Sequence, residues 1–175
     1  MNAPRHPVPI SALCGILLLW LAVGSAAVGE IGASCPHCGM EKAKFGHSWM
    51  EIVYDDGSVT GFCSVHCAAL DMALNIDKAA VTTTVGDYRT EKPIDAEKAF
   101  WVIGGDRPGV MTTRAKWAFE DREAADAFVA EHGGVPADFE RVVRAAFEDM
   151  HEDIRMIHEK RKRMRMRRKS EESGG

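Results

Sequence analysis

Two close pairs of cysteines are the residues of this chain whose type and spacing are suited to chemistry. The pairs have the spacings C-x2-C and C-x3-C, 24 residues separate them, and their members are Cys35, Cys38, Cys63 and Cys67. Four thiolates in two such pairs are typical of a metal site, because sulfur binds soft and borderline metal ions strongly. The spacing therefore predicts that one metal ion is held between the pairs.

Met40 indicates which metal this is. It lies two positions after Cys38, and a neutral thioether is a donor that Zn(II) seldom recruits but Cu(I) accepts readily. His37 and His66 lie inside the two cysteine motifs and offer nitrogen donors. The favoured metal is thus Cu(I), and the candidate ligands are Cys38, Met40, Cys35, Cys63, Cys67, His37 and His66.

Three other interpretations of the cysteines remain open. In an oxidising compartment the four thiols could form two disulfides that staple a small unit. A closed set of four thiolates could instead hold a structural zinc ion. Thiol redox chemistry is the third interpretation, and it is the least favoured.

The elements expected around the cysteines form a hairpin followed by a helix. A strand over His47–Tyr54, a turn at Asp55–Ser58 and a return strand over Val59–Cys63 match the hairpin pattern. Ser64 is suited to the N-cap of a helix that runs through Asn75. Beyond it we expect a strand over Val81–Val85 and a connection over Gly86–Asp95.

The second half repeats this layout. The expected order is a strand at Ala99–Ile103, a loop at Gly104–Gly109, a strand at Lys116–Phe119, a helix over Asp121–His132 that ends at Gly133-Gly134, and from Asp138 onward a long amphipathic helix. The predicted class is α+β, with two small ββα(β)-type units in tandem, a long C-terminal helix and an N-terminal signal or anchor helix.

The charge of the chain is divided between a body and a tail. The net charge of −4 hides a body, residues 30–149, with 12 basic and 21 acidic side chains, and a segment, Lys160–Lys169, in which eight of ten residues are basic. Such a segment favours anionic phospholipid headgroups or an acidic partner surface. Copper binding by its Met164 and Met166 is less favoured, because dense positive charge repels a cation.

The first residues are typical of an export signal. Arg5, an apolar stretch over Ile10–Val23 and small residues up to Ala27 follow the secretory pattern, with a retained membrane anchor as the alternative. We therefore expect a periplasmic or otherwise extracytoplasmic protein that does not bind nucleic acid. The predicted segments are 1–29 (signal or anchor), 30–95 (cysteine-rich unit), 96–137 (second unit) and 138–175 (helix with basic tail).

Several motifs together resemble the NosL family of exported copper proteins associated with nitrous oxide reductase. They are Cys38-Gly39-Met40, the acidic hairpin turn, the stretch 95–105 (DAEKAFWVIGG), Met111 and the stretch 116–135 (KWAFEDREAADAFVAEHGGV). The resemblance implies two ββα-type units related to organomercurial lyase. It also implies a Cu(I) site at Cys38 and Met40, from which copper is handed to the clusters of the enzyme.

Two features depart from that family. The segment Phe62–Cys67 is similar to the FCSxxC element of YHS and TRASH-type domains of heavy-metal sensing and trafficking proteins, and no well-formed lipoprotein motif surrounds Cys14 or Cys35. A fuller thiolate set would bind metal more tightly and release it less easily.

The leading hypothesis is a non-enzymatic, exported Cu(I) metallochaperone or copper reservoir. Its partner would be a copper-receiving apo-enzyme, with nitrous oxide reductase suspected, or another copper trafficking protein. The alternatives are a heavy-metal sequestration or sensing protein and a disulfide- or zinc-stapled interaction module. An enzymatic alternative is organomercurial cleavage, with two thiolates and a proton donor supplied by Cys63, Cys67 and Asp71, and its main support is fold analogy.

Overall fold

The computed structural model describes residues 32–173, and the predicted signal or anchor segment lies outside them. The helices are α1 (Lys42–Phe45), a 3₁₀ turn η1 (Gly46–Ser48), α2 (Val65–Leu74), α3 (Arg122–His132) and α4 (Phe139–Ser173). The strands are β1 (Met50–Tyr54), β2 (Val59–Phe62), β3 (Ala80–Gly86), β4 (Pro93–Asp95), β5 (Phe100–Ile103), β6 (Lys116–Phe119) and β7 (Val135–Ala137). This confirms the predicted α+β class with two small units and a long C-terminal helix.

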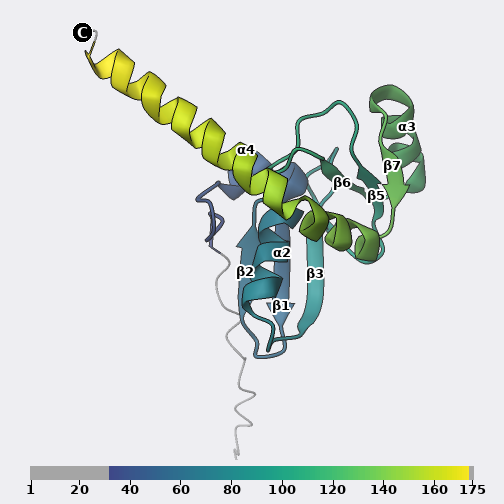
Figure 1. The fold of residues 1–175 in the computed structure, drawn as a ribbon. Coiled ribbons are helices and arrows are strands. Elements are labelled where there is room, and N and C mark those ends of the chain that lie inside the picture. The colour runs from purple at the N-terminus through teal and green to yellow at the C-terminus, as the bar shows by residue number, and fades with distance from the viewer. Residues whose placement is uncertain (1–31, 174–175) are drawn as a thin grey trace, which may run out of the picture.

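The first unit is a four-stranded antiparallel sheet in the order β2-β1-β3-β4, with α2 packed against β1 and β2 (Figure 1). The hairpin register pairs Met50 with Phe62, which places both fully buried side chains at the end of the sheet where Cys63 follows.

β3 approaches η1 very closely at Gly86, where an added Cβ would lie 1.8 Å from the Gly46 carbonyl oxygen. Glycine is therefore required at this position.

The second unit is a three-stranded antiparallel sheet in the order β6-β5-β7, covered by α3. Asp121 caps α3, because its carboxylate accepts a hydrogen bond of 2.7 Å from the Ala124 backbone N–H. Gly133 ends this helix with a φ of 74°, as the Gly-Gly pair predicts.

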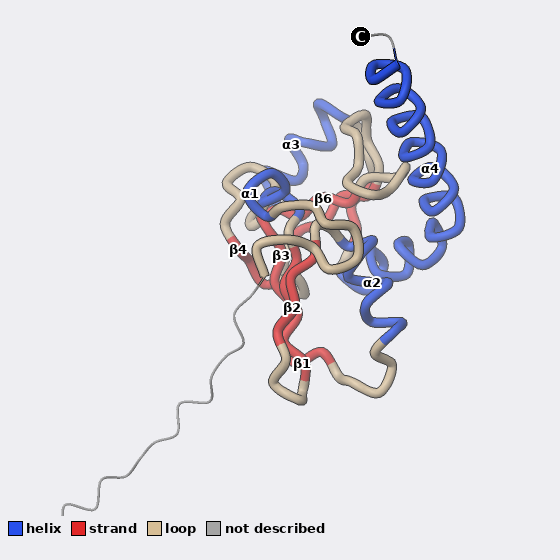
Figure 2. Tube along the Cα trace, turned by 90° about the vertical axis from the view of Figure 1, so that its left-hand side faces the viewer, coloured by secondary structure: helices blue, strands red, loops and turns tan. Residues whose placement is uncertain are grey.

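The two units share one hydrophobic core. Buried side chains of both sheets belong to one cluster, and the Tyr88 N–H donates to the Ala118 carbonyl at 2.8 Å across the units. α4 contacts α2 of the first unit and β5 of the second, and its later turns then extend past both (Figures 1 and 2). Among the described residues, no helix is both long and apolar enough to cross a bilayer.

Several local expectations need correction. The connection expected over Gly86–Asp95 contains the edge strand β4, and the strand β7 follows α3 where no strand was expected. The first strand was expected to begin at His47, but β1 begins at Met50 and His47 lies in η1. Short strands such as β4 and β7 exist through pairing with β3 and β5, which a local pattern does not contain. Ser64 occupies the N-cap of α2 without making a side-chain cap bond, and Leu74 on its last turn is exposed.

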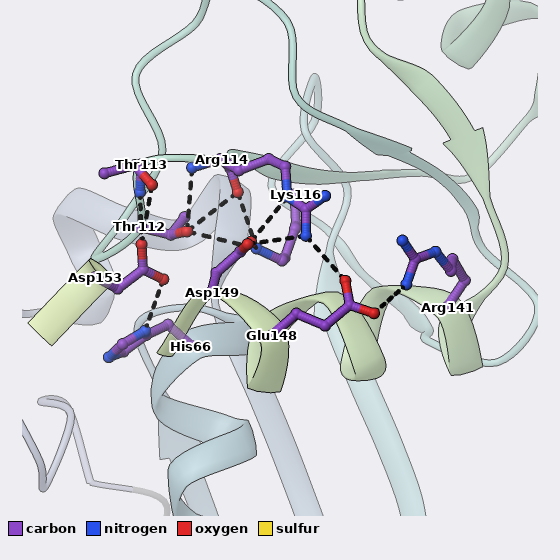
Figure 3. Close-up of polar contacts among 9 residues, drawn as sticks. All are labelled: His66, Thr112, Thr113, Arg114, Lys116, Arg141, Glu148, Asp149 and Asp153. Carbon is purple, nitrogen blue, oxygen red and sulfur yellow. Dashed lines mark hydrogen bonds and ion pairs between the residues drawn. The ribbon is translucent and has the colours of Figure 1, made fainter. Parts of the chain in front are cut away.

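A buried carboxylate fixes α4 on the first unit. Asp153 is fully buried and accepts three hydrogen bonds: from His66 Nδ1 at 3.2 Å, from the Thr113 backbone N–H at 2.8 Å and from the Thr113 hydroxyl at 3.2 Å (Figure 3). A buried charge is tolerated only when such partners replace its water. Asp153 therefore ties α4 to α2 and to the loop before β6 at once.

A second polar contact lies one turn earlier on the same helix (Figure 3). Asp149 accepts hydrogen bonds of 2.8 Å from the Lys116 ammonium and 2.9 Å from Arg114 Nε, and the Lys116 side chain is almost fully buried. Burial raises the pKa of Asp149, but the hydrogen bonds from Arg114 and Lys116 outweigh this and leave its pKa below the usual value. α4 is thus held to β6 by a charged pair as well.

We predict that Asp153→Ala lowers the free energy of unfolding by about 3–5 kcal/mol, because it strands the His66 ring and the Thr113 N–H without an acceptor. Urea denaturation followed by circular dichroism measures this. Glu152→Ala removes a neighbouring exposed carboxylate that contacts only Arg155, and it should change stability by no more than about 0.5 kcal/mol. Equal effects of the two substitutions would contradict the role assigned to Asp153.

Candidate metal centre

The four cysteines that the sequence singled out converge on one point. Their sulfur atoms all lie within 4.8 Å of one another, with 3.4 Å between Cys38 and Cys63 and 3.7 Å between Cys63 and Cys67. In a tetrahedral site with metal–sulfur bonds of about 2.3 Å, neighbouring sulfurs are ~3.8 Å apart. The thiols of these four residues are free in the structure, so the group has the size and the donors of a metal centre.

The first pair is positioned by a tight knuckle. The Gly39 N–H donates to the Cys35 carbonyl, and the Cys35 N–H donates to the Met40 carbonyl, both at 2.8 Å. Gly39 has a φ of 78°, in the left-handed region that favours glycine, with open space around it. Its conformation turns the chain after Cys38 so that the Met40 carbonyl returns to the Cys35 N–H and closes the knuckle.

The second pair lies at a junction between a strand and a helix. Cys63 follows the end of β2, and Cys67 lies in the first turns of α2. The buried Ser48 hydroxyl donates to the Cys63 carbonyl at 2.8 Å, which fixes the backbone at the point where the strand ends. Both cysteines are therefore held by elements of the core.

The electrostatics of the cluster favour one thiolate among protonated thiols. Hydrogen bonds from the Cys63 and Cys67 side chains hold the pKa of Cys35 far below its usual value. The hydrogen bond with Cys35, together with burial, raises the pKa of Cys63 and of Cys67 well above the usual thiol range. A metal cation that enters must therefore displace protons from the buried thiols.

The four sulfurs differ in their access to solvent. Cys35, Cys63 and Cys67 are at most 1% exposed, whereas Cys38 is only half-buried. Access from outside to the cluster is therefore greatest on the Cys38 side.

Of the remaining predicted ligands, His37 and His66 do not belong to the group of donor atoms that the four cysteines form. Met40 is half-buried against the core and is joined to Cys35 through its backbone carbonyl. The His37 ring stacks on the Phe62 ring with 5.7 Å between the ring centroids, and its Nε2 lies 3.0 Å from an Asp71 carboxylate oxygen. The Nδ1 of His66 contacts the Asp153 carboxylate. One nitrogen of each imidazole is thus already occupied by a carboxylate.

Asp71 is a support for the cluster region. It accepts a hydrogen bond of 2.6 Å from the Tyr54 hydroxyl and is 3.0 Å from His37 Nε2. Burial and this hydrogen bond raise the pKa of Tyr54. Asp71 is not among the donors grouped with the cysteines. Its carboxylate is therefore not placed with Cys63 and Cys67 as the organomercurial cleavage considered from the sequence would require.

The sequence interpretation missed the residues that hold these elements in place. Asp153, Asp149, Lys116 and Thr113 all belong to the polar contacts of α4. A signal was present for Asp153, because it occupies an inward position of the helical pattern, three residues after Met150 and four before Ile157. A charged side chain at an apolar position of that pattern indicates a buried polar contact.

Comparison with known proteins places this geometry in context. A family model described as NosL matches residues 28–147. The crystal structure of the copper chaperone NosL from Shewanella denitrificans is similar in fold, with a TM-score of 0.52 and 24% sequence identity, over 64% of this chain and 92% of that one. A search of curated proteins found none that matches.

We predict that the affinity of the reduced protein for Cu(I) rises with pH, because protons compete with the metal for the buried thiols whose pKa values are raised. The expected slope is about tenfold per pH unit for each proton displaced. Competition with a chromophoric Cu(I) chelator at about pH 6 and about pH 8 measures it. An affinity independent of pH would contradict binding by Cys63 and Cys67.

Proposed function

The chain belongs to the NosL family, and from this premise we propose that it is an exported Cu(I)-binding protein that acts as a metallochaperone or copper reservoir. The observation that carries the proposal is the convergence of four sulfur donors within 4.8 Å of one another, with Met40 two positions after Cys38 in the chain. Thiolate and thioether donors favour Cu(I) over harder ions. The proposed role is binding and transfer without catalysis, because the donors that converge in the described part of the chain are all cysteine sulfurs.

The uneven burial of the cluster supports transfer of copper to a partner. An incoming ligand reaches a metal most easily beside Cys38, which is half-buried, while the three buried sulfurs keep hold of it. Stepwise exchange of one ligand for another then moves Cu(I) without releasing it to water. We propose that the recipient is a copper-receiving apo-enzyme, with nitrous oxide reductase as the candidate that the family resemblance implies.

The same cluster also favours a second function, the sequestration of heavy metals. Three of the four thiols are almost inaccessible, and a complete set of four thiolates binds Cu(I) or Zn(II) tightly. Slow release would suit storage or resistance better than delivery. The rate at which bound Cu(I) passes to a competing chelator discriminates between the two functions.

We predict that the reduced protein binds about one Cu(I) in the cluster and that Cys38→Ser or Met40→Leu weakens this binding. The loss should exceed the roughly 10–100-fold cost of removing a partner that only supports a ligand. Chelator competition measures the affinity. Met72→Leu, a half-buried core methionine of α2, is the matched control and should leave the affinity unchanged.

A parallel titration with Zn(II) tests the role of Met40. A thioether contributes little to zinc, so Met40→Leu should reduce the affinity for Cu(I) while leaving that for Zn(II) nearly unchanged. Unchanged Cu(I) affinity in both the Cys38 and the Met40 variants would refute the proposed function.

We also propose that the protein works outside the cytoplasm, near a membrane. The secretory pattern of Met1–Glu30 and the basic segment Lys160–Lys169, which lies on the exposed part of α4, support this. Fractionation of expressing cells should place the protein in the periplasmic or membrane fraction. Release from membranes by a salt wash indicates attachment through the basic segment, retention indicates the N-terminal segment, and a cytoplasmic protein contradicts export.

A further inference from the structure

A groove of about 630 Å³ opens between the loop before β6 and the projecting part of α4. Four of the nine methionines of the chain line it: Met40, Met111, Met156 and Met164. Met111 adopts a φ of 58°, an uncommon conformation for a residue with a side chain. The groove thus brings four thioethers together in a place that is open to solvent.

The geometry of α4 explains which of its side chains reach the groove. With 3.6 residues per turn, residues three, four, seven, eight and eleven positions after Asp153 lie on the same face as Asp153. These positions are the α4 residues that line the groove: Met156, Ile157, Lys160, Arg161 and Met164. The buried contacts of Asp153 with His66 and Thr113 (Figure 3) set the rotation of the helix. This rotation places Met156 and Met164 on the face of α4 that lines the groove.

Met166 provides a contrast on the same helix. It is two residues beyond Met164, which places it about 200° further round the helix, and it does not line the groove. The two side chains are almost equally exposed, at 56% for Met164 and 53% for Met166. Position on the helix, and not exposure or composition, therefore separates a methionine that faces the groove from one that does not.

The chemistry of the groove suits a monovalent soft ion. Thioethers are neutral donors that bind Cu(I). The cationic side chains of Lys160 and Arg161 repel a divalent ion about twice as strongly as a monovalent one, because the Coulomb energy scales with charge. Neutral donors beside positive charge also make any bound Cu(I) easy to release, unlike the thiolates of the cluster.

The groove is connected to the cluster through Met40. This residue follows Cys38 by two positions, its carbonyl accepts the Cys35 N–H, and its side chain lines the groove. Met156 and Met164 lie about 12 Å apart along the helix axis, since they are eight positions apart and each position adds about 1.5 Å. Met40 therefore joins the cluster to the groove, and Met156 and Met164 lie at two different heights on the α4 wall of the groove.

We propose that Met156 and Met164 of α4 form a thioether path along which Cu(I) passes between the four-cysteine cluster and the outside. The inference rests on the proposed copper-binding function. Each exchange breaks one Cu–S bond to a thiolate or thioether as a bond forms to another of the sulfurs that line the groove, which are those of Met40, Met111, Met156 and Met164. The copper stays Cu(I), no electrons are transferred, and a thiolate that is left behind takes up a proton from solvent.

The first test follows the methionine methyl groups by NMR. In protein labelled with ¹³C at the methionine ε-methyl, addition of Cu(I) beyond one equivalent should shift the signals of Met156 and Met164 and leave that of Met166 in place. The Cu(I) ion is diamagnetic, so the signals stay observable. Equal shifts for all three residues, or none for Met156 and Met164, would overturn the proposal.

The second test measures transfer. Cu(I) is removed from the loaded full-length protein by bicinchoninate in a stopped-flow instrument, in wild type and in Met156→Leu, Met164→Leu and Met166→Leu. Leucine keeps the apolar volume, and the exposed Met164 and Met166 tolerate the change without loss of fold. We expect a rate about fivefold lower in the first two variants, wild-type rates in the third, and equilibrium affinity within about twofold of wild type in all three.

Unchanged rates with tight binding intact would overturn the thioether path alone. Absence of a tight Cu(I) equivalent in wild type would instead refute the proposed function on which the path rests. A loss of equilibrium affinity in the Met156 or Met164 variants equal to that of Cys38→Ser would place these methionines in the cluster site and would also overturn the path.

Discussion

The burial of the Asp153 carboxylate is the constraint on which the arrangement of this molecule depends. A charge without water needs several donors in fixed positions, and Asp153 finds them on His66 of α2 and on Thr113 of the loop before β6. Only one rotation and one height of α4 satisfy all of these contacts together. Apolar packing alone is less directional, so the helix would otherwise be free to slide over α2.

The cysteine cluster is built next to the Asp153 contact, on the same helix α2. His66 and Cys67 are consecutive residues of α2, so the helix that carries one end of the Asp153 contact also carries a sulfur of the cluster. The hairpin places Cys63 beside it, and the knuckle at Gly39 brings the first pair across. Four donors from three separate segments are thus brought together by the fold before any metal binds, which reduces the ordering that binding itself must accomplish.

The sequence predicted the elements that have a strong local signal. The hairpin, α2, α3 and the α+β class were all expected, and the two cysteine pairs were recognised as one group of donors. The strands β4 and β7 were missed because three residues carry too little periodicity and depend on partners distant in sequence. The partners of Asp153 and Asp149 were missed for a related reason: a periodic pattern shows which residues face inward but not what they meet there. Whether His37, His66 and Met40 bind metal stays a prediction, since the carboxylate contacts of both imidazoles became visible only in the folded chain.

The projecting part of α4 also acts as a lever. From its fixed point at Asp153 to its end at Ser173, twenty residues span about 30 Å. A tilt of about 10° at the fixed point would move the far end by ~5 Å, while the first turns shift by only a fraction of that distance. Small adjustments where α2 meets α4 are therefore magnified at the basic end of the helix, and the width of the methionine-lined groove changes with them.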